Sequence, residues 1–528
     1  MLESHKMKTK IICCGPFILA SLLLCAANVQ ADPLLTSWFT VNSGKYARVY
    51  ISTNNRTAGI SSTTWGSGSS GQTSPTYAGV HEIDYSAGWV YIKNTGLSSF
   101  VMGPWNNPNL AKNQGTSTSV YRFPRGAAGV TNDTGSTSTA RLTGMGAIGF
   151  LADGVAIFNT SDGYSYSYAH SEDADPVAGI GNGDGIWNRD AWTNEYVSFD
   201  YAFNHPQQAG QYHSHANPIA TRYLLGDNVN YNSATKVYSE NSGATNLKHS
   251  PILGWLNDGL PVYGPYGYSN PTNAASGVRR MVSGYVLRNG SYGNANVTVS
   301  GRTNLPIWAQ LAQGRATLTA TQYGPSTTYT TGGAGGNIGY GLGHYAEDYD
   351  YLGDLGFIQG VTNTVGGYTA FYDLNEFNAR YCVTPEYPNG TWAYFVTIKS
   401  DGSPAYPYNV GRWYFGNPTG GSTTVTVMNA DTPLTQYFKG DTNLPAVLNV
   451  PSVNAGNVTL TWSAVEGGTY QVNVSSNLSS TWTTNLALTL TATNNTATTT
   501  ETGVATTNNM RFYRVNRTGV AAFDSTGY

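Results

Sequence analysis

Short alternations of apolar and polar residues, separated by turn residues, run through the chain from Leu34 to about Thr435. Val90–Ile92 and Trp392–Ile398 are examples, and the second follows the turn dipeptide Asn389-Gly390. Alternation with period two predicts half-buried strands, whereas a helical period stands out over Pro306–Arg315. The pattern therefore predicts an all-β fold, with one large multi-stranded β domain over residues 32–440.

From about Asn443 the composition changes to Thr, Asn, Val and Leu, and three further segments alternate with period two. They are Val458–Trp462, Thr469–Val474 and Met510–Val515. Several short strands without a cysteine predict a small β-sandwich over residues 445–516, followed by a tail over 517–528. This segment resembles the fibronectin-III-like modules that close many secreted bacterial proteins, so we expect it to space, attach or tether the main domain.

One segment of the chain is repeated. Ala147–Asn159 aligns with Ile252–Gly264, which lies 105 residues further on, and each copy has apolar residues on both sides of an Asp-Gly pair. Asp-Gly between apolar runs is a strong signal for a hairpin with a type I′ turn, which needs positive φ at both central residues. We therefore expect two equivalent hairpins that pack in related positions, with Asp153 and Asp258 first as turn residues and second as ligands.

The first 31 residues have the pattern of a secretory signal peptide. Three lysines, at positions 6, 8 and 10, precede the apolar run Ile11–Leu24, and Ala31 ends a small-residue cleavage site. The pattern predicts a secreted or periplasmic protein, with a lipid anchor at Cys25 as the alternative. No later segment approaches the ~20 apolar residues of a membrane-spanning helix, so we expect no stable membrane span.

Composition excludes several classes of protein. Charged residues make up 11% and aromatic residues 12% of the 528, and the net charge is −3. Nucleic-acid-binding proteins are usually basic and disordered chains lack aromatic residues, so we expect neither class and no nucleic-acid partner. Cleavage after Ala31 would change 27 basic and 30 acidic residues to 24 and 29, a net charge of −5. It would also leave one cysteine, Cys382, so no internal disulfide is expected.

The histidines are concentrated in one short part of the chain. Four of the seven that would remain after cleavage, His205, His213, His215 and His249, fall within 45 residues. In a strand, residues i and i+2 point to the same face, so His213 and His215 would lie side by side. With His249 as a third imidazole they predict a transition-metal site, with His205 and His344 as weaker candidates. Imidazole ligands suit copper, zinc, iron or nickel, and a single thiol disfavours a zinc–thiolate site; we expect copper or zinc.

Other functions remain open at the level of the sequence. The metal could serve redox or hydrolytic chemistry, or the protein could be a metal-free hydrolase in which a histidine acts as general base beside Asp258 or Glu386. The abundance of Tyr and Trp also fits an extracellular polysaccharide- or surface-binding protein without catalysis. The loop Asn182–Asp190 is rich in Asp and Gly, but lacks the ligand ladder of an EF-hand, so a turn is preferred there over a calcium site.

The histidine segment resembles the YHYH domain family, which is named for a Tyr-His-Tyr-His motif. The residues that carry the likeness are Tyr212-His213-Ser214-His215, His249-Ser250-Pro251 and the second Asp-Gly hairpin, and further landmarks extend it over Val90–Gly416. The resemblance implies an exported bacterial protein and no agreed biochemical activity. The motif histidines map onto His213 and His215, and the later His-Ser-Pro onto His249. Ser214 replaces the second Tyr of the motif and would point away from the histidines.

Overall fold

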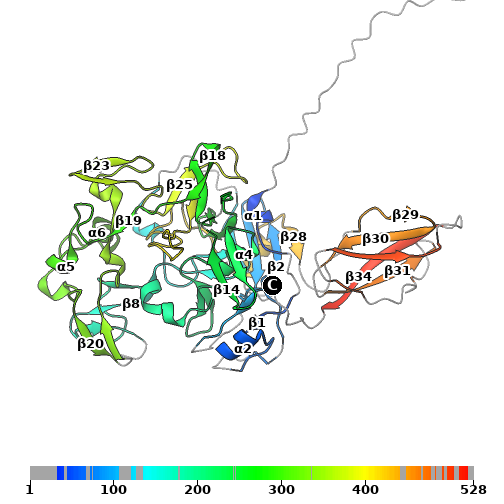
Figure 1. Cartoon of the computed structure of the whole chain (residues 1–528), viewed down its shortest axis with the longest axis horizontal. Coiled ribbons are helices and arrows are strands. Elements are labelled where there is room, and N and C mark those ends of the chain that lie inside the picture. The colour runs from blue at the N-terminus through cyan, green and yellow to red at the C-terminus, as the bar shows by residue number, and fades with distance from the viewer. Residues whose placement is uncertain are drawn as a thin grey trace, which may run out of the picture. The chain divides into compact units, whose positions relative to one another are not determined.

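The computed structural model describes residues 32–520 except for 41–44, 67–71, 74, 106–119, 126–134, 176–178, 242, 244, 334–335, 440–447, 465–467, 477–481, 483–489, 493–495 and 505–509. Strands make up 37% of the chain and helices 13%, which confirms the predicted all-β class (Figure 1). No helix in the described part of the chain is long and apolar enough to cross a membrane. The predicted signal peptide and the cysteine of the lipid-anchor alternative lie outside the described residues.

The helices are short and lie between the strands. The α-helices are α1 (Pro33–Thr36), α2 (Thr53–Ala58), α3 (Ala191–Glu195), α4 (Ile219–Leu224), α5 (Val297–Ser300), α6 (Ile307–Gln313) and α7 (Val425–Ala430). The 3-10 turns are η3 (Thr139–Arg141), η4 (Tyr196–Ser198), η5 (Ala320–Gln322), η6 (Ala346–Asp348) and η7 (Leu352–Leu355). Helix α6 falls within the one segment whose period predicted a helix. Its C-terminus is capped by Gly314, at φ 60°.

The largest sheet has eight strands. Their order is β11 (Asn204–Pro206), β12 (Tyr212–Ser214), β7 (Ala156–Ile157), β6 (Gly149–Leu151), β15 (Ile252–Leu256), β16 (Pro261–Tyr263), β26 (Thr391–Phe395) and β25 (Ala379–Cys382). The two repeated segments form the hairpins β6–β7 and β15–β16, which pair with each other through β6 and β15. The prediction that they pack in related positions is therefore confirmed.

The eight-stranded sheet has an approximate twofold axis at its centre. Phe150 and Trp255, which are equivalent in the repeat, lie directly opposite each other where β6 and β15 pair antiparallel. On one side β12 runs parallel to β7, and on the other β26 runs parallel to β16. Each of these outer strands forms a second antiparallel hairpin, β11–β12 and β25–β26. The sheet thus consists of two halves with the same strand order and directions.

The turns of the two hairpins are alike but differ from the predicted type. In the first, Gly154 N donates to Leu151 O, and among the loop residues the positive φ is at Gly154, at 88°. In the second, Gly259 N donates to Leu256 O and Gly259 has φ 77°. The type I′ prediction is wrong, because each loop has three residues and is closed by one left-handed glycine. The aspartates do act as turn residues, since each Oδ1 accepts from the backbone N–H two residues on.

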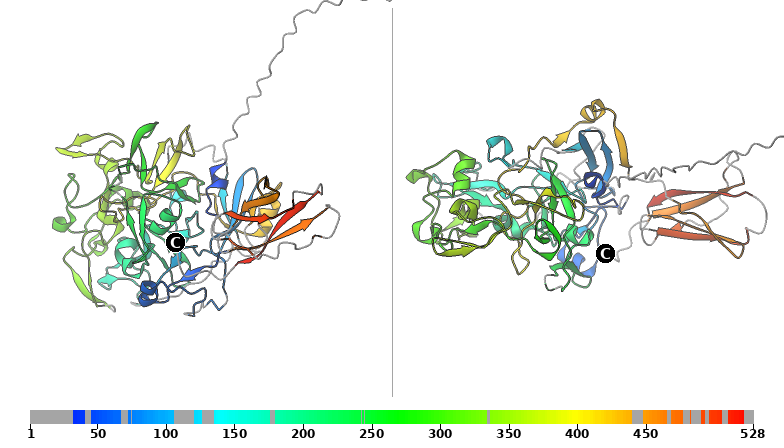
Figure 2. Two further views of the ribbon diagram at one scale, coloured as in Figure 1. Left: turned by 45° about the vertical axis from the view of Figure 1, so that its right-hand side comes forward. Right: turned by 90° about the horizontal axis from the view of Figure 1, so that it is seen from above.

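A second sheet covers part of one face of the large one. It has five strands in the order β27 (Gly421–Thr423), β5 (Val120–Pro124), β3 (Trp89–Asn94), β2 (Val80–Tyr85) and β28 (Thr435–Lys439). Ile83 and Ile92 from this sheet share one buried cluster with Phe150 and Trp255. Strand β28 comes from late in the chain, and Figures 1 and 2 show it in orange beside the blue strand β2. The centre of the eight-stranded sheet is therefore closed on this face.

The remaining strands of the main domain form small sheets. They are β1 (Arg48–Val49) with β4 (Val101–Met102); β8 (Ser161–Ser167) between β10 (Asn188–Asp190) and β9 (Glu172–Asp173); β13 (Val229–Asn232) with β14 (Val237–Glu240); β17 (Tyr266–Asn270) with β18 (Asn273–Arg280); β19 (Tyr285–Leu287) with β22 (Tyr349–Tyr351); β20 (Thr330–Gly333) with β21 (Gly336–Gly339); and β23 (Asn363–Val365) with β24 (Tyr368–Ala370). The pair β1–β4 precedes the large sheet in the chain, and the other small sheets occupy long connections between strands of the large sheet.

The C-terminal segment forms two three-stranded sheets. One contains β29 (Ser452–Asn454), β30 (Asn457–Ser463) and β33 (Thr496–Glu501), and the other β32 (Leu490–Thr491), β31 (Gly468–Ser475) and β34 (Phe512–Val520). Trp462 and Tyr470 join the sheets in one core, with ring centroids 6.0 Å apart. Strand β34 continues into the predicted tail, whose last eight residues lie outside the described part. The boundary near residue 440 and the likeness to fibronectin III stay predictions.

Candidate functional site

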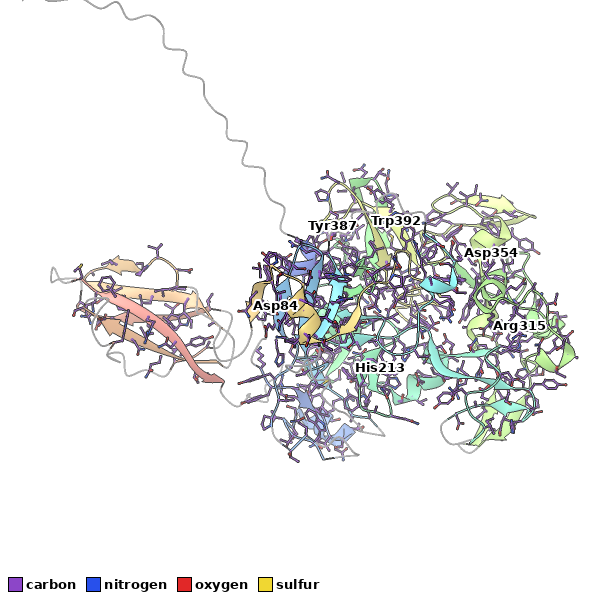
Figure 3. All side chains as sticks on the ribbon, turned by 180° about the vertical axis from the view of Figure 1, so that it is seen from behind. Asp84, His213, Arg315, Asp354, Tyr387 and Trp392 are labelled. Atoms are coloured by element: carbon purple, nitrogen blue, oxygen red, sulfur yellow. The ribbon has the colours of Figure 1, made fainter. Side chains whose placement is uncertain are left out.

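Three histidine side chains meet at one end of the eight-stranded sheet. Nε2 of His213 lies 3.0 Å from Nε2 of His205 and 2.9 Å from Nε2 of His215. All three side chains are buried, with at most 5% of their surface exposed. Within the part of the chain that the structure describes, this is the one group of three His, Cys, Asp or Glu ligand atoms close enough to share an ion. His213 is labelled in Figure 3.

The hairpin β11–β12 produces this arrangement. His205 and His213 lie directly opposite each other in the antiparallel register, so their rings meet across the two strands. His215 follows two residues after His213, and its ring reaches the same point with a centroid 4.7 Å from that of His213. The ring of Phe158 stacks on His213 at 3.9 Å. The ring of Phe199 meets His205 edge-on at 4.5 Å, which packs the cluster from another side.

Hydrogen bonds determine which nitrogen of each imidazole carries its proton. Nδ1 of His213 lies 2.9 Å from Gln211 O, and Nδ1 of His215 lies 2.6 Å from Asn159 O. A carbonyl oxygen only accepts, so both Nδ1 atoms must donate, and in a neutral imidazole the Nε2 atom then bears a lone pair. Both Nε2 atoms therefore point bare lone pairs into the centre of the cluster.

His205 reaches the same state through a serine. The Ser198 hydroxyl donates to Glu195 O at 2.6 Å, and its oxygen lies 2.7 Å from Nδ1 of His205. Since that hydroxyl proton is committed to a carbonyl, the serine oxygen accepts from Nδ1–H of His205. The Nε2 atom of His205 is then also unprotonated. Three lone pairs thus converge at contacts as short as 2.9–3.0 Å, an unfavourable arrangement unless a cation lies among them.

A carboxylate lies at the edge of the cluster. Oε2 of Glu195, at the end of α3, is 3.3 Å from Nε2 of His215 and 3.6 Å from Nε2 of His205. This oxygen is buried and has no hydrogen-bond partner among the described residues. Burial raises the pKa of Glu195 well above its usual range, and the nearby Asp162 raises it further. The unpartnered oxygen of Glu195 thus adds a fourth potential donor to the three imidazole nitrogens.

Burial keeps the imidazoles neutral. It lowers the pKa of His215 to about 4, and it lowers the pKa of His205 and of His213 well below the ordinary value. Neutral imidazole is the form that binds metals, so the site is prepared for a ligand role rather than for holding protons.

The cluster opens into a cavity of about 660 Å³. Trp105 and Tyr164 contribute aromatic walls, and Asp162 contributes a carboxylate that lies 2.8 Å from Nε of Arg189. Burial raises the pKa of Asp162 to about 7. A cavity of this volume can admit a small molecule to the side of the histidine cluster that borders it.

His249 and His344 lie elsewhere. Strands β7 and β6 separate β12, which carries His213, from β15, which follows His249. His249 packs against Tyr263 and Tyr268, and its Nδ1 lies 2.8 Å from Ser250 O. His344 contacts Asp173, with Nε2 2.6 Å from Oδ2. The structure therefore brings together His205, His213 and His215, with His205 in the place that the sequence suggested for His249.

The acidic candidates have structural partners. Oδ2 of Asp258 accepts from the Tyr394 hydroxyl at 2.5 Å and from Gly416 N at 2.9 Å. Oε2 of Glu386 accepts from the Tyr263 hydroxyl at 2.9 Å. In the loop that was compared with a calcium site, Oδ2 of Asp184 accepts from Tyr168 N. None of these carboxylates belongs to the histidine group among the described residues.

Two members of the site were missed or ranked low from the sequence. His205 had a signal, since a turn between Pro206 and Gln211 places it opposite His213, and Gly210 N donates to Gln207 O there. Glu195 had none, because α3 has five residues and no pattern that distinguishes one carboxylate.

The family model described as YHYH protein matches residues 128–406, a narrower span than the predicted Val90–Gly416. No curated protein and no solved structure matches the chain. The matched span includes the three clustered histidines and both Asp-Gly hairpins, and it covers more than half of the 528 residues. The chain therefore belongs to the YHYH protein family.

Proposed function

We propose that this protein binds one transition-metal ion through Nε2 of His205, His213 and His215, with Glu195 as a fourth donor. The observation that carries the proposal is the convergence of three unprotonated Nε2 atoms, each with its Nδ1–H held by a hydrogen bond. Metal-binding histidines in proteins are typically oriented in this way. Two nitrogens bound at ~2.1 Å to one ion, at right angles to each other, lie ~3.0 Å apart, close to the separations here.

Copper and zinc are the ions that we propose. Three imidazoles and a carboxylate suit both, and thiolate ligation is absent from the described site because Cys382 is buried elsewhere in the core. The cavity beside the cluster leaves a face of the ion open to a small molecule. A metal with three or four protein donors and an open side suits hydrolytic or redox chemistry, so we extend the proposal to a catalytic metal in an exported protein.

Metal analysis of protein purified without added ions tests the proposal. We expect about one copper or zinc per chain, and loss of that metal in the double variant His213→Ala, His215→Ala. His205→Ala should also lose metal, whereas His249→Ala should retain it, so this pair distinguishes the two ligand sets. Electron paramagnetic resonance of copper-loaded protein should show nitrogen couplings that disappear in the double variant. Equal metal content in the wild type and the double variant would refute the proposal.

A further inference from the structure

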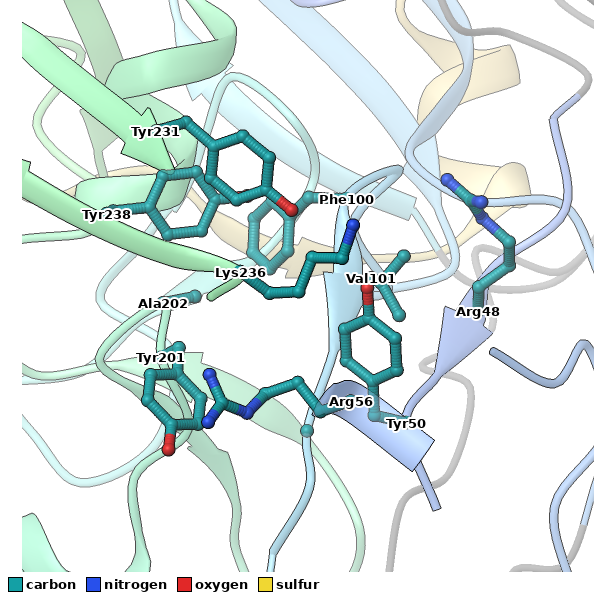
Figure 4. A pocket seen from close by; sticks show the side chains of 11 residues that line it. Arg48, Tyr50, Arg56, Phe100, Val101, Tyr201, Ala202, Tyr231, Lys236 and Tyr238 are labelled. Carbon is teal, nitrogen blue, oxygen red and sulfur yellow. The ribbon is translucent and has the colours of Figure 1, made fainter. Parts of the chain in front are cut away.

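A second cavity, which we call the Arg412 cavity, adjoins the histidine cavity. Its volume is about 380 Å³, within the ~300–1,000 Å³ range that is typical of small-molecule sites. Met145 and Ser161 line both cavities, so the two spaces meet at these residues. The pocket in Figure 4 lies among other residues and has a volume of about 20 Å³, room for little more than one water molecule. Of these two further spaces, the Arg412 cavity is the one that can hold an organic ligand.

Strand β8 forms a wall between the Arg412 cavity and the histidine cavity. Asp162 and Tyr164 line the histidine cavity, whereas Gly163 lines the Arg412 cavity and Ser161 lines both. This alternation is the one expected of a strand with a space on each face. Met145 lies over the same strand, since a Cβ atom at Gly163 would be 2.9 Å from its Cε. A ligand longer than one cavity would therefore pass Ser161 and Met145 to reach the other.

The Arg412 cavity contains a half-buried cation without an ion pair. Nη1 of Arg412 donates to Thr143 O, and Arg412 forms no ion pair with a described residue. Burial lowers the pKa of this arginine, and the charge of Glu347 opposes that shift only in part. A guanidinium has five N–H donors, so most of those of Arg412 remain available to a ligand.

The same cavity contains hydrogen-bond acceptors. Oε1 of Gln313 is buried and has no hydrogen-bond partner among the described residues. The Glu347 carboxylate accepts from Asn188 N and Asn188 Nδ2, each at 2.7 Å, and from Gln313 Nε2 at 3.1 Å. A carboxylate has about four acceptor positions, so one remains. Burial raises the pKa of Glu347 to about 7, so at neutral pH its protonated form can also donate.

These groups favour a neutral ligand that is rich in hydroxyl groups. A simple anion would approach Glu347 as well as Arg412, and a simple cation would meet the same two residues, so either ion would be repelled by one of them. A hydroxyl group both donates and accepts, and can therefore satisfy Gln313 Oε1 and the N–H groups of Arg412. Trp308 and Ala312 add apolar surface, which suits the C–H groups of a sugar ring.

An extended peptide, which is also neutral, fits this place less well. Peptides commonly bind by pairing with the free N–H and C=O groups of a strand. On β8, the N–H groups of Ser161, Gly163 and Tyr164 each donate to a side-chain oxygen two residues earlier. The wall between the two cavities therefore offers no N–H group at these positions to a peptide.

We propose that the Arg412 cavity binds one unit of a neutral oligosaccharide and that an adjacent unit enters the histidine cavity. Trp105 and Tyr164 provide aromatic surface in the histidine cavity, and Gln207 and Gln208 provide amide groups. The described residues that line it include no lysine and no arginine. The second part of the proposal names a substrate class for the metal site and rests on the function proposed above.

Isothermal titration of the purified full-length protein tests the sugar site. The probes are the β-linked hexamers of glucose, xylose, mannose and N-acetylglucosamine, with an oligogalacturonate and a neutral hexapeptide library as the acidic and peptide alternatives. We expect saturable binding of at least one neutral hexamer. Arg412→Gln should weaken it by at least about tenfold, because hydrogen bonds from a charged group are lost, and Ala312→Phe should do the same by filling the cavity. Leu311→Phe, at an exposed neighbouring position of α6 outside the lining, should bind as the wild type does.

Three results would overturn the sugar site. They are absence of saturable binding of all four neutral hexamers, tighter binding of the acidic or peptide probe, and unchanged affinity in both Arg412→Gln and Ala312→Phe. Urea midpoints of the variants close to that of the wild type would show that a loss of affinity does not come from unfolding.

Electron paramagnetic resonance of copper-loaded protein tests the extension towards the histidines. The hexamer that binds should change the copper spectrum of the wild type but not that of Ala312→Phe, and an unchanged wild-type spectrum would refute the extension. Sugar binding that depends on Arg412 in a protein without metal would contradict the proposed function, and the extension with it, but not the sugar site. Metal binding without sugar binding would refute the sugar site and leave the proposed function intact.

Discussion

Replacement of Ser198 by alanine is the sharpest test of how the histidine cluster is prepared. The Ser198 hydroxyl accepts from Nδ1–H of His205 at 2.7 Å while it donates to Glu195 O at 2.6 Å. Each of the three clustered histidines has one contact that holds its Nδ1–H group. The contact of His205 is the one that a side-chain substitution can remove, because those of His213 and His215 are to backbone carbonyls. Without the hydroxyl, His205 can carry its proton on Nε2, the atom that faces the other histidines, and in that form it is not a ligand.

The size of the effect follows from the role of the contact. Loss of a hydrogen bond that orients a metal-binding histidine typically costs ~10–100-fold in metal affinity, or about 1.4–2.7 kcal/mol. The metal-free protein should lose only about 1 kcal/mol of stability, because one partly buried neutral hydrogen bond is removed. The expected signature is therefore a large change in metal affinity with a small change in folding.

Competition titrations of copper and zinc against a chromophoric chelator measure that affinity. Ser198→Thr keeps the hydroxyl and should bind close to the wild type. Ser161→Ala removes a hydroxyl from the wall of the same cavity, where it accepts from Gly163 N, and should also bind as the wild type does. If Ser198→Ala bound both ions as tightly as the wild type, the assignment of the His205 proton would be wrong.

Two other predictions concern the fold and its dependence on pH. Gly259→Ala should destabilise the protein by clearly more than the ~1 kcal/mol expected for Gly314→Ala. Both glycines have positive φ, but a Cβ at Gly259 would lie 2.5 Å from Pro124 O, whereas a Cβ at Gly314 would meet open space. Equal urea midpoints for the two variants would contradict this. In metal-free protein the pKa of His215 is lowered to about 4 in the folded state, below the value near ~6.5 in the unfolded chain. The unfolded chain therefore binds more protons between these pKa values, so the stability of the folded protein falls as the pH drops from 7 to 5. The contribution is about 2 kcal/mol, and denaturation at both pH values should show a smaller pH dependence in His215→Ala than in the wild type.

The sequence predicted features that depend on short-range patterns. The strands near Val90 and Trp392, the helix near Pro306 and the paired Asp-Gly hairpins all follow from local periodicity or turn chemistry. The turn type was wrong, because an Asp-Gly pair fits both a two-residue loop with two left-handed residues and a three-residue loop closed by glycine. Loop length depends on the register of the strands, which the dipeptide alone does not determine.

The site was only partly predictable for a similar reason. His213 and His215 are close in sequence and share a strand, so the period of two was enough to bring them together. His205 required the register of β11 against β12, and Glu195 required the placement of the five-residue helix α3, from whose end its side chain reaches the histidines. His249 precedes a strand of the same sheet, but its distance from His213 depends on the strand order, with β7 and β6 in between. Proximity in sequence did not carry this information.

The twofold arrangement of the eight-stranded sheet provides an internal control for the chemistry. By strand register, His213 corresponds to Ala393, and its neighbour across the hairpin, His205, corresponds to Arg380. The same four-strand arrangement thus occurs twice in one chain, while the three clustered histidines belong to one of the two halves. Residues that hold the sheet together should be common to both halves, and residues that bind the proposed metal ion should be among their differences. A comparison of the two halves within a single molecule therefore separates residues needed for folding from residues that serve the proposed metal site.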